Sequence, residues 1–365
     1  MNSTGQLILS NYDANSTERS LPLSNKSYGN GAATFDMPHA GIPTHITVTF
    51  DGKLEITNGT TVGTVTASPM WPYNLVAPSP FMDYSGNTRI YADGYSLYMR
   101  ELVLGTDIEP KTPYSQESYA DHVYSASVPN GTANGTVTST IRFGVTFPIA
   151  LKSTTAWGSY DATVPKGTAQ LTINENTLTG PYINSPLTVS NTTGLKVSLT
   201  GNWSAEYYYL DAPSSVPKPV QALQEIHEYF VTNSDTDQIA PAGTPSEVLL
   251  TGRTYYRVLQ NLIANNELNT LDVTKVQFLV DSSTPTKNET LASYLFNTRR
   301  RFNRDFPLGM FVWDFMSKPW SPNSYGSLTV QLGLDNTISA GNFKQLTTVR
   351  ETLYVPSGNL VKAGG

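Results

Sequence analysis

Residues 298–309 read Thr298-Arg299-Arg300-Arg301-Phe302-Asn303-Arg304-Asp305-Phe306-Pro307-Leu308-Gly309. Four arginines fall within six residues, and an acidic residue, an aromatic residue, a proline and a glycine follow them. Such a cluster is typical of a surface that binds phosphate or nucleic acid. It is also typical of a contact between protein subunits, because each guanidinium can make a planar two-point contact with a carboxylate. The rest of the sequence has to distinguish these two interpretations.

The segment before the cluster predicts a helix that ends at the arginines. Thr284-Pro285 is a good helix start, because the threonine hydroxyl can cap the helix and proline fits its first turn. We expect the helix to end near Phe302, with Arg299–Arg301 in its last turn. Cations there interact favourably with the negative end of the helix dipole, and each stabilises the helix by roughly 0.3–1 kcal/mol. Because three successive helical residues cannot share one face, they are expected to reach different partners, with Asp305 and Asp314 as the candidates.

Apolar and polar residues alternate along most of the chain, as they do in half-buried strands. The clearest runs are Ile46/Val48/Phe50, Ile141/Phe143/Val145/Phe147, Leu195/Val197/Leu199, Val276/Phe278/Val280, Phe311/Trp313/Phe315 and Leu328/Val330/Leu332. The turns expected between strands are Asp51-Gly52, Asn58-Gly59, Asn130-Gly131, Asn134-Gly135 and Gly201-Asn202. Many short strands joined by such turns predict an all-β fold built from sandwiches or closed antiparallel barrels.

Two markers recur and predict a duplicated domain. An aromatic segment after Gly94 returns after Gly252, 158 residues later, and residues 257–263 have the spacing of a helix face. Thr112-Pro113 returns as Thr284-Pro285, 172 residues later. These offsets fit a domain of roughly 150–180 residues. Residues 1–30 are predicted to form an extended polar arm and residues 356–365 a loose tail, and the two domains between them are expected to meet near residues 203–219.

Charge and composition exclude several classes of protein. Only 14% of the 365 residues are charged and the net charge is −6, which argues against a protein that mainly coats nucleic acid. The low charge suggests instead a surface covered by neighbouring molecules. The absence of cysteine excludes thiol catalysis, zinc–thiolate sites and disulfides. We expect no signal peptide in residues 1–20, and no apolar run approaches membrane-spanning length.

The sequence predicts no catalytic, metal or cofactor site. Glu225-Ile226-His227-Glu228 could supply two metal ligands, but no third ligand can be named. No nucleophile elbow, dinucleotide fingerprint or phosphate-binding loop is present. Trp71, Trp157, Trp203 and Trp320 could stack on sugars, which leaves a two-domain β-sandwich carbohydrate-active enzyme or lectin as an alternative. A shell protein that binds nucleic acid through its arginines is a second alternative.

Four blocks of the chain resemble one known family. The first runs from Thr298 to Gly326 with the pattern Thr-Arg-Arg-Arg-x-x-x-Asp-Phe-Pro-x-Gly, followed by Asp314, Lys318-Pro319 and Tyr325-Gly326. The weaker blocks are Pro72-x-Asn74-Leu75-Val76 up to Gly94, Phe147-Pro148-Ile149-Ala150, and Val164-Pro165 leading to Leu171. In these residues the chain resembles the major capsid protein of tectiviruses, bacteriophages with an icosahedral shell over an internal lipid membrane.

The resemblance implies two tandem eight-stranded jelly rolls with short helices in their loops, at residues 31–206 and 207–355. It implies a homotrimeric, nearly hexagonal capsomer that contacts neighbouring capsomers, minor capsid and vertex proteins and the internal membrane. Direct binding of nucleic acid, catalysis and cofactors are not expected. The protein would belong to the virion and assemble in the cytoplasm of a bacterial host.

Six residues of the arginine-rich block are predicted to have structural or interface roles. We expect Arg299, Arg300, Arg301 and Asp305 to hold protein to protein. Pro307 and Gly309 are expected to set the bend into the Phe311–Phe315 strand, because proline restricts the backbone and glycine frees it.

Overall fold

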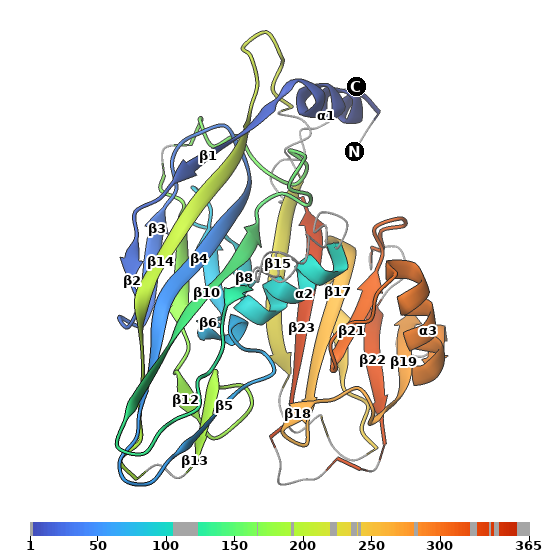
Figure 1. Cartoon of the computed structure of the whole chain (residues 1–365). Coiled ribbons are helices and arrows are strands. Elements are labelled where there is room, and N and C mark those ends of the chain that lie inside the picture. The colour runs from blue at the N-terminus through green and yellow to red at the C-terminus, as the bar shows by residue number, and fades with distance from the viewer. Residues whose placement is uncertain are drawn as a thin grey trace. The chain divides into compact units, whose positions relative to one another are not determined.

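The computed structural model describes residues 3–104, 123–165, 167–190, 193–219, 225–234, 239, 242–280, 284–321, 327–335, 337–338 and 343–355. Strands dominate these residues, which hold three α-helices of 11 to 13 residues (Figure 1). The predicted all-β class is therefore confirmed. The chain divides into two compact units. The first comprises Met1–Tyr98, Pro110–Phe230 and Leu353–Gly365, and the second comprises Met99–Glu109 and Val231–Thr352.

The first unit is built on an antiparallel sheet with the order β1-β14-β4-β10-β9, in which β2 also pairs with β14 (Figure 1). Its strands are β1 (Thr17–Pro22), β2 (Lys26–Ser27), β4 (Ile42–Thr57), β9 (Val123–Ser125), β10 (Thr136–Pro148) and β14 (Lys196–Asp211). Alternate residues of the long strands are buried, as the period-two pattern predicts. The rings of Phe50, Phe143 and Trp203 meet in this core, with centroids 4.8–5.9 Å apart.

A second sheet in the first unit has the order β8-β7-β11-β3. Its strands are β3 (Ala32–Asp36), β7 (Ser79–Met82), β8 (Thr88–Ala92) and β11 (Gln170–Glu175), with β6 (Val76–Ala77) paired to β11 and β15 (Ile226–Ser234) paired to β8. The remaining elements are the 3₁₀ helix η1 (Tyr73–Leu75), β5 (Thr64–Ala67), β12 (Thr179–Gly180) and β13 (Leu187–Ser190). Helix α2 (Gly94–Leu104) follows β8, and Ser96 N donates to Asp93 Oδ1 (2.7 Å) at its start.

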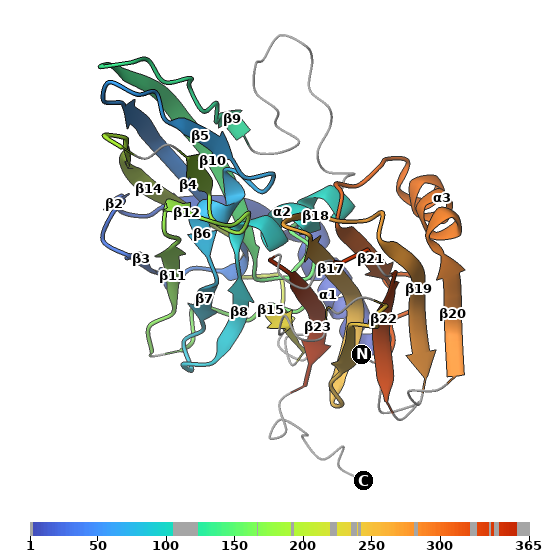
Figure 2. The same cartoon turned by 90° about the horizontal axis from the view of Figure 1, so that it is seen from below.

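The second unit contains an antiparallel sheet with the order β16-β22-β19-β20. Its strands are β16 (Ser246–Leu249), β19 (Val273–Val280), β20 (Thr284–Thr290) and β22 (Leu328–Leu334). The unit also holds β17 (Arg253–Ala264), β18 (Glu267–Leu268), β21 (Met310–Asp314) and β23 (Gln345–Tyr354). A core that includes Val258, Phe278, Phe311 and Val330 joins the two groups of strands. Helix α3 (Leu291–Phe302) contacts β19 and β20 (Figure 2).

Two predicted helix positions are wrong. Residues 257–263 belong to strand β17, whose last ten residues are all buried, so the strand shows no alternation and its apolar run imitates a helix face. Thr284-Pro285 opens strand β20, and helix α3 begins only after Thr290, whose side chain accepts from Ser293 N (3.3 Å). The recurring glycine marker therefore starts different elements, because Gly94 begins helix α2 and Gly252 precedes strand β17. The Thr112-Pro113 segment lies outside the described residues.

Two predicted turns are also wrong. Asp51-Gly52 and Gly201-Asn202 lie inside β4 and β14, where Gly52 and Gly201 face each other across the sheet. A Cβ on Gly52 would lie 2.5 Å from the carbonyl oxygen of Thr200, so this glycine allows a close approach of backbones and does not form a turn.

The N-terminal segment was predicted to be extended. This prediction is wrong for its first part, which forms helix α1 (Ser3–Asn15). Leu9 and Tyr12, one helical turn apart, are buried against a cluster that includes Ile42 and Leu210. The Tyr12 hydroxyl donates to the carbonyl oxygen of Leu210 (3.3 Å). Packing on one side therefore stabilises a helix whose own periodicity is weak. The predicted tail at 356–365 lies outside the described residues.

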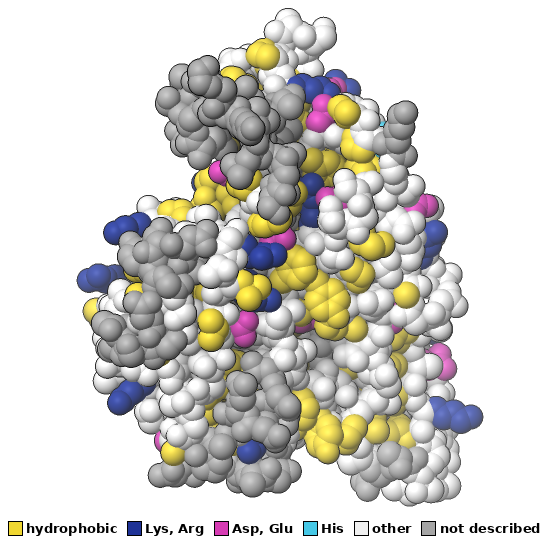
Figure 3. Space-filling view, turned by 180° about the vertical axis from the view of Figure 1, so that it is seen from behind, with side chains coloured by type: hydrophobic (Ala, Val, Ile, Leu, Met, Phe, Trp, Pro, Cys, Tyr) yellow, Lys and Arg dark blue, Asp and Glu magenta, His cyan; other side chains and the backbone are white. Residues whose placement is uncertain are grey.

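Charged side chains are sparse on the surface. On the face drawn in Figure 3 they occur singly or in small groups, and uncharged side chains cover most of the described area. Within the part of the chain that the structure describes, no helix combines the length and the apolar composition needed to cross a membrane.

Candidate functional site

The arginine cluster occupies the last turn of α3, as predicted, and the loop that follows. Asn303 ends the helix in the left-handed conformation (φ +53°). Arg299 Nη1 lies 3.5 Å from Asp305 Oδ2, and Arg301 Nη2 lies 2.6 Å from Asp314 Oδ2. Both predicted acidic partners are therefore confirmed. Arg304 Nη1 donates to the carbonyl oxygen of Leu102 (3.1 Å).

The arginines differ in their surroundings. The side chains of Arg299 and Asp305 are each 72% exposed, so this ion pair contributes little to stability. The Asp314 side chain is only 11% exposed, so its contact with Arg301 is less screened by solvent. Arg300 is exposed, and no ion pair of its guanidinium occurs among the described residues. Among the residues that the structure describes, Arg300 is therefore the one arginine of the cluster without a partner in its own chain.

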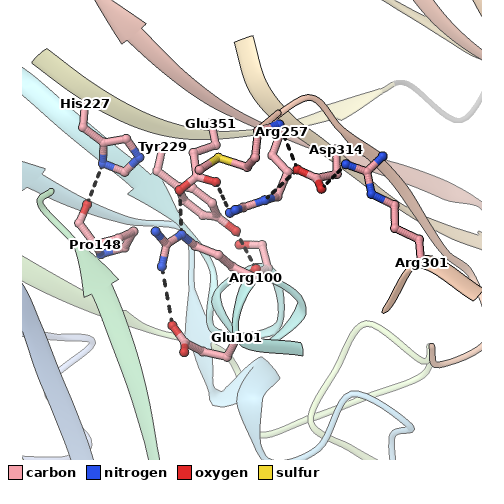
Figure 4. Close-up of polar contacts among 11 residues, drawn as sticks. Arg100, Glu101, Pro148, His227, Tyr229, Arg257, Arg301, Asp314 and Glu351 are labelled. Carbon is pink, nitrogen blue, oxygen red and sulfur yellow. Dashed lines mark hydrogen bonds and ion pairs between the residues drawn. The ribbon is translucent and has the colours of Figure 1, made fainter. Parts of the chain in front are cut away.

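Arg301 is the outer end of a series of ion pairs that lies within the second unit and leads to its buried residues (Figure 4). Arg257 Nε lies 3.6 Å from Asp314 Oδ1, and Arg257 Nη1 donates to Glu351 Oε2. Arg100 Nε donates to Glu351 Oε1 (2.8 Å), and Arg100 Nη1 lies 3.6 Å from Glu101 Oε1. We call the six residues Arg301, Asp314, Arg257, Glu351, Arg100 and Glu101 the ion-pair chain.

Signs alternate along the ion-pair chain, so its six formal charges cancel. The side chains of Arg100, Arg257 and Glu351 are each 4% exposed or less. Buried charges are tolerated only when they are paired and hydrogen-bonded, because desolvating an ion costs several kcal/mol. The ion-pair chain therefore joins residues of α2, α3, β17, β21 and β23 as one set, and losing one of its buried members would leave another buried charge unpaired.

The inner part of the ion-pair chain, from Arg257 to Glu101, could not be inferred from the amino-acid sequence. Arg100 and Arg257 stand within otherwise apolar segments, and an arginine in such a segment predicts a buried acidic partner. That signal does not identify the partner, because Arg100 and Glu351 are 251 residues apart in sequence.

A tyrosine joins helix α3 to β21. The Tyr294 hydroxyl accepts from Val312 N (2.6 Å) and contacts the carbonyl oxygen of Val312 (3.5 Å). Tyr294 is buried, and burial raises the pKa of its hydroxyl to about 12. The hydroxyl therefore stays protonated at neutral pH.

The bend between α3 and β21 uses Gly309, one of the two residues predicted for that role. Gly309 has a φ of +79°, which only glycine adopts readily, and its N–H donates to Thr270 Oγ1 (2.7 Å). Its carbonyl oxygen accepts from Leu262 N (2.8 Å) on β17. The carbonyl oxygen of Pro307 accepts from Met310 N (3.2 Å). These contacts support the predicted bend.

Comparison with known proteins identifies the fold. A scan against family models and a search of curated proteins both found no match. Among solved structures, the STIV MCP matches 95% of this chain and 100% of its own, at 15% identity and a TM-score of 0.66. An atomic structure of Sulfolobus Turreted Icosahedral Virus matches 93% of this chain and 91% of its own, at 14% identity and a TM-score of 0.65. The PBCV-1 virus capsid matches 93% and 95%, at 10% identity and a TM-score of 0.54.

These neighbours are double jelly-roll capsid proteins. This chain has the double jelly-roll fold. The match extends over nearly the whole chain, so both jelly rolls are included. The predicted fold is therefore confirmed. At these levels of identity, the likeness concerns the fold.

In this double jelly roll, the residues considered as metal ligands have structural partners. His227 is buried and its Nδ1 contacts the carbonyl oxygen of Pro148 (3.0 Å; Figure 4). Glu225 Oε2 accepts from Trp157 Nε1 (3.0 Å). No group of three or more metal-ligating side chains occurs within the described ranges.

The tryptophans considered for sugar binding are also part of the double jelly roll's packing. Trp203 is buried and donates to Glu175 Oε1 (3.0 Å), and Trp71 donates to the carbonyl oxygen of Ala126 (2.6 Å). Trp320 packs on Phe278, with ring centroids 5.1 Å apart. None of the five tryptophans, all within the described residues, is an exposed platform for a sugar ring.

Proposed function

We propose that this chain is the major capsid protein of an icosahedral virus and works by assembly, without catalysis. The observation that supports this most strongly is the structural match to a viral capsid protein with the double jelly-roll fold. The match extends over 95% of this chain and 100% of that protein. The capsomer would be a homotrimer. Three double jelly rolls supply six similar blocks, which suits a nearly hexagonal unit that tiles a shell.

The surface supports assembly more than binding of nucleic acid. The net charge is −6, whereas a nucleic-acid coat needs excess positive charge. Of the four clustered arginines, Arg299 and Arg301 pair with acids of the same chain and Arg304 binds a backbone oxygen. A low surface charge also fits a protein whose flanks are covered by neighbouring subunits.

The finer assignment is part of the same proposal. The resemblance of residues 298–326 to tectiviruses supports a bacteriophage shell over an internal membrane, with minor capsid and vertex proteins as further partners. The protein would reside in the virion after assembly in the cytoplasm of a bacterial host. We propose two jelly rolls in tandem, for which the sequence predicts residues 31–206 and 207–355, with an arm at residues 1–30 and a tail at 356–365. The division into two compact units supports two domains.

The solution mass of the purified protein tests this proposal. We expect sedimentation equilibrium to give about three times the chain mass of 39.8 kDa at micromolar concentration, because capsomers of this type associate through large obligate interfaces. A lectin or glycosidase of two β-sandwich domains would sediment as a monomer and bind immobilised oligosaccharides. That result would contradict the capsid assignment.

A further inference from the structure

A groove of about 700 Å³ lies beside helix α3 in the second unit and is lined by residues of α3, β19, β20, β21 and the segment after β21. Phe278, Phe315 and Trp320 line it, with ring centroids 5.1–6.3 Å apart. Arg300 and Arg301, from the last turn of α3, also line it. We call it the α3 groove. The half-buried rings of Phe315 and Trp320, packed on the buried Phe278, lie with the exposed guanidinium of Arg300, and aromatic rings and arginine are the side chains most enriched at the centres of protein interfaces.

The charges of the α3 groove do not cancel. Lys287 is balanced by Glu289 (3.0 Å), and Arg301 is balanced by Asp314 (2.6 Å). Arg300 lines the same groove, and the described residues offer it no carboxylate. Within the described part of the chain the groove therefore keeps one uncompensated guanidinium, which a carboxylate from outside could bind at two points.

A buried donor in the wall of the groove also lacks an acceptor. Trp313 lines the α3 groove and is 2% exposed, and its indole Nε1 makes no hydrogen bond to any described residue. A buried N–H without a partner costs about 1–3 kcal/mol, so it needs an explanation. An acceptor oxygen brought by a partner would supply one.

The outer face of α3 extends the groove with apolar surface. Phe296 is 66% exposed and Leu295 is 44% exposed, so two neighbouring apolar side chains of this helix lie open to solvent. Phe296 stands four residues before Arg300, so the two side chains share one side of the helix. A ring next to an unpaired guanidinium has the composition of an interface hot spot.

We propose that the α3 groove and the adjoining Phe296 bind a carboxylate-bearing surface of a second copy of this chain. This proposal rests on the proposed function and names the surface through which copies associate. Without Arg300 the chain carries a net charge of −7 (−6 minus one cation), so a second copy is an acidic partner that is always present. Phosphate of a nucleic acid is the competing ligand, but a single free guanidinium beside three aromatic rings suits a protein surface better.

The absence of cysteine from the chain permits a direct test with single cysteines. Phe296→Cys reports on the proposed surface, and Leu271→Cys, at a site 77% exposed in the same unit, is the matched control. Maleimide labelling of Phe296→Cys should slow about tenfold or more when the protein is concentrated into its oligomer, because an interface core excludes solvent. Labelling of Leu271→Cys should change by less than about twofold, since an exposed site outside the interface stays accessible. If sedimentation verifies the oligomer but labelling of Phe296→Cys slows no more than labelling of Leu271→Cys, the inference is overturned and the proposed function stays intact.

A charge reversal gives an independent readout. Arg300→Glu should raise the dissociation constant of the oligomer about tenfold or more, because it places a carboxylate against a carboxylate. Lys196→Glu, which reverses an exposed cation in the first unit, should change it less than about twofold. If the protein without substitutions is a monomer at every concentration, both this inference and the proposed function are overturned. Protection of Phe296→Cys by duplex DNA in the absence of oligomer would overturn the protein partner in favour of phosphate.

Discussion

Replacing Glu351 by alanine is expected to lower the free energy of unfolding by about 3–5 kcal/mol, because two buried guanidinium groups then lose their shared carboxylate. Glu351 is 1% exposed and binds Arg100 and Arg257 through different oxygens. Glu351→Gln should cost nearly as much, since it keeps the volume and removes the charge. Urea denaturation at one fixed protein concentration measures both effects, and fixing the concentration matters because oligomers gain stability by mass action.

Two controls separate charge from packing in this prediction. Glu267→Gln removes an exposed carboxylate in the same unit and should change the unfolding free energy by less than about 0.5 kcal/mol. Replacing Arg100, Glu351 and Arg257 together by methionine, leucine and methionine should recover much of the loss, because an apolar set has no desolvation cost. If Glu351→Ala costs under about 1 kcal/mol, the ion-pair chain is not the buried charge set described above.

Replacing Gly309 by alanine is expected to destabilise the protein by about 3 kcal/mol or more, because strain and a steric clash add. A Cβ at this position would lie 2.6 Å from the carbonyl oxygen of Leu262, which itself belongs to a buried strand and cannot move freely. The φ of +79° adds the cost of placing a side chain in a left-handed backbone conformation, about 1–2 kcal/mol.

Gly252 provides a matched control for the backbone term. It has the same φ of +79° in the same unit, but a Cβ there would meet nothing within 4 Å. Gly252→Ala should therefore cost only the conformational part, about 1–2 kcal/mol. Equal thermal and urea stabilities of the two alanine variants would show that the close approach of β17 does not restrict residue 309.

The strands were predictable where one face meets the core and the other does not. In β4, Ile46, Val48 and Phe50 are buried between half-buried threonines, so the sequence carries the strand's period directly. Strand β17 was not predictable in this way, because burial on both sides removes the alternation. Helix α1 was missed because its burial depends on Leu9 and Tyr12 reaching residues far along the chain. Tertiary packing decides such elements more than local preference does.

In the candidate site, too, the sequence predicts contacts between residues close in the chain and not those between distant residues. The end of α3 and the partners of Arg299 and Arg301 follow from contacts within about one helical turn or one adjacent strand, which sequence spacing can express. The inner part of the ion-pair chain could not be predicted, since it joins Arg100 to Glu351 across 251 residues. That Arg300 has no ion pair and Trp313 Nε1 no acceptor among the described residues could not be predicted, because it depends on every neighbour of each side chain.

Electron microscopy of the purified, negatively stained protein tests most directly whether this double jelly roll builds a viral shell. Averaged projections should show particles with threefold symmetry and a nearly hexagonal outline, because three copies contribute six similar jelly rolls. Concentrated samples should also form flat arrays or closed shells of these particles. Single particles without symmetry at every concentration, each the size of one 39.8 kDa chain, would contradict the proposed capsid role.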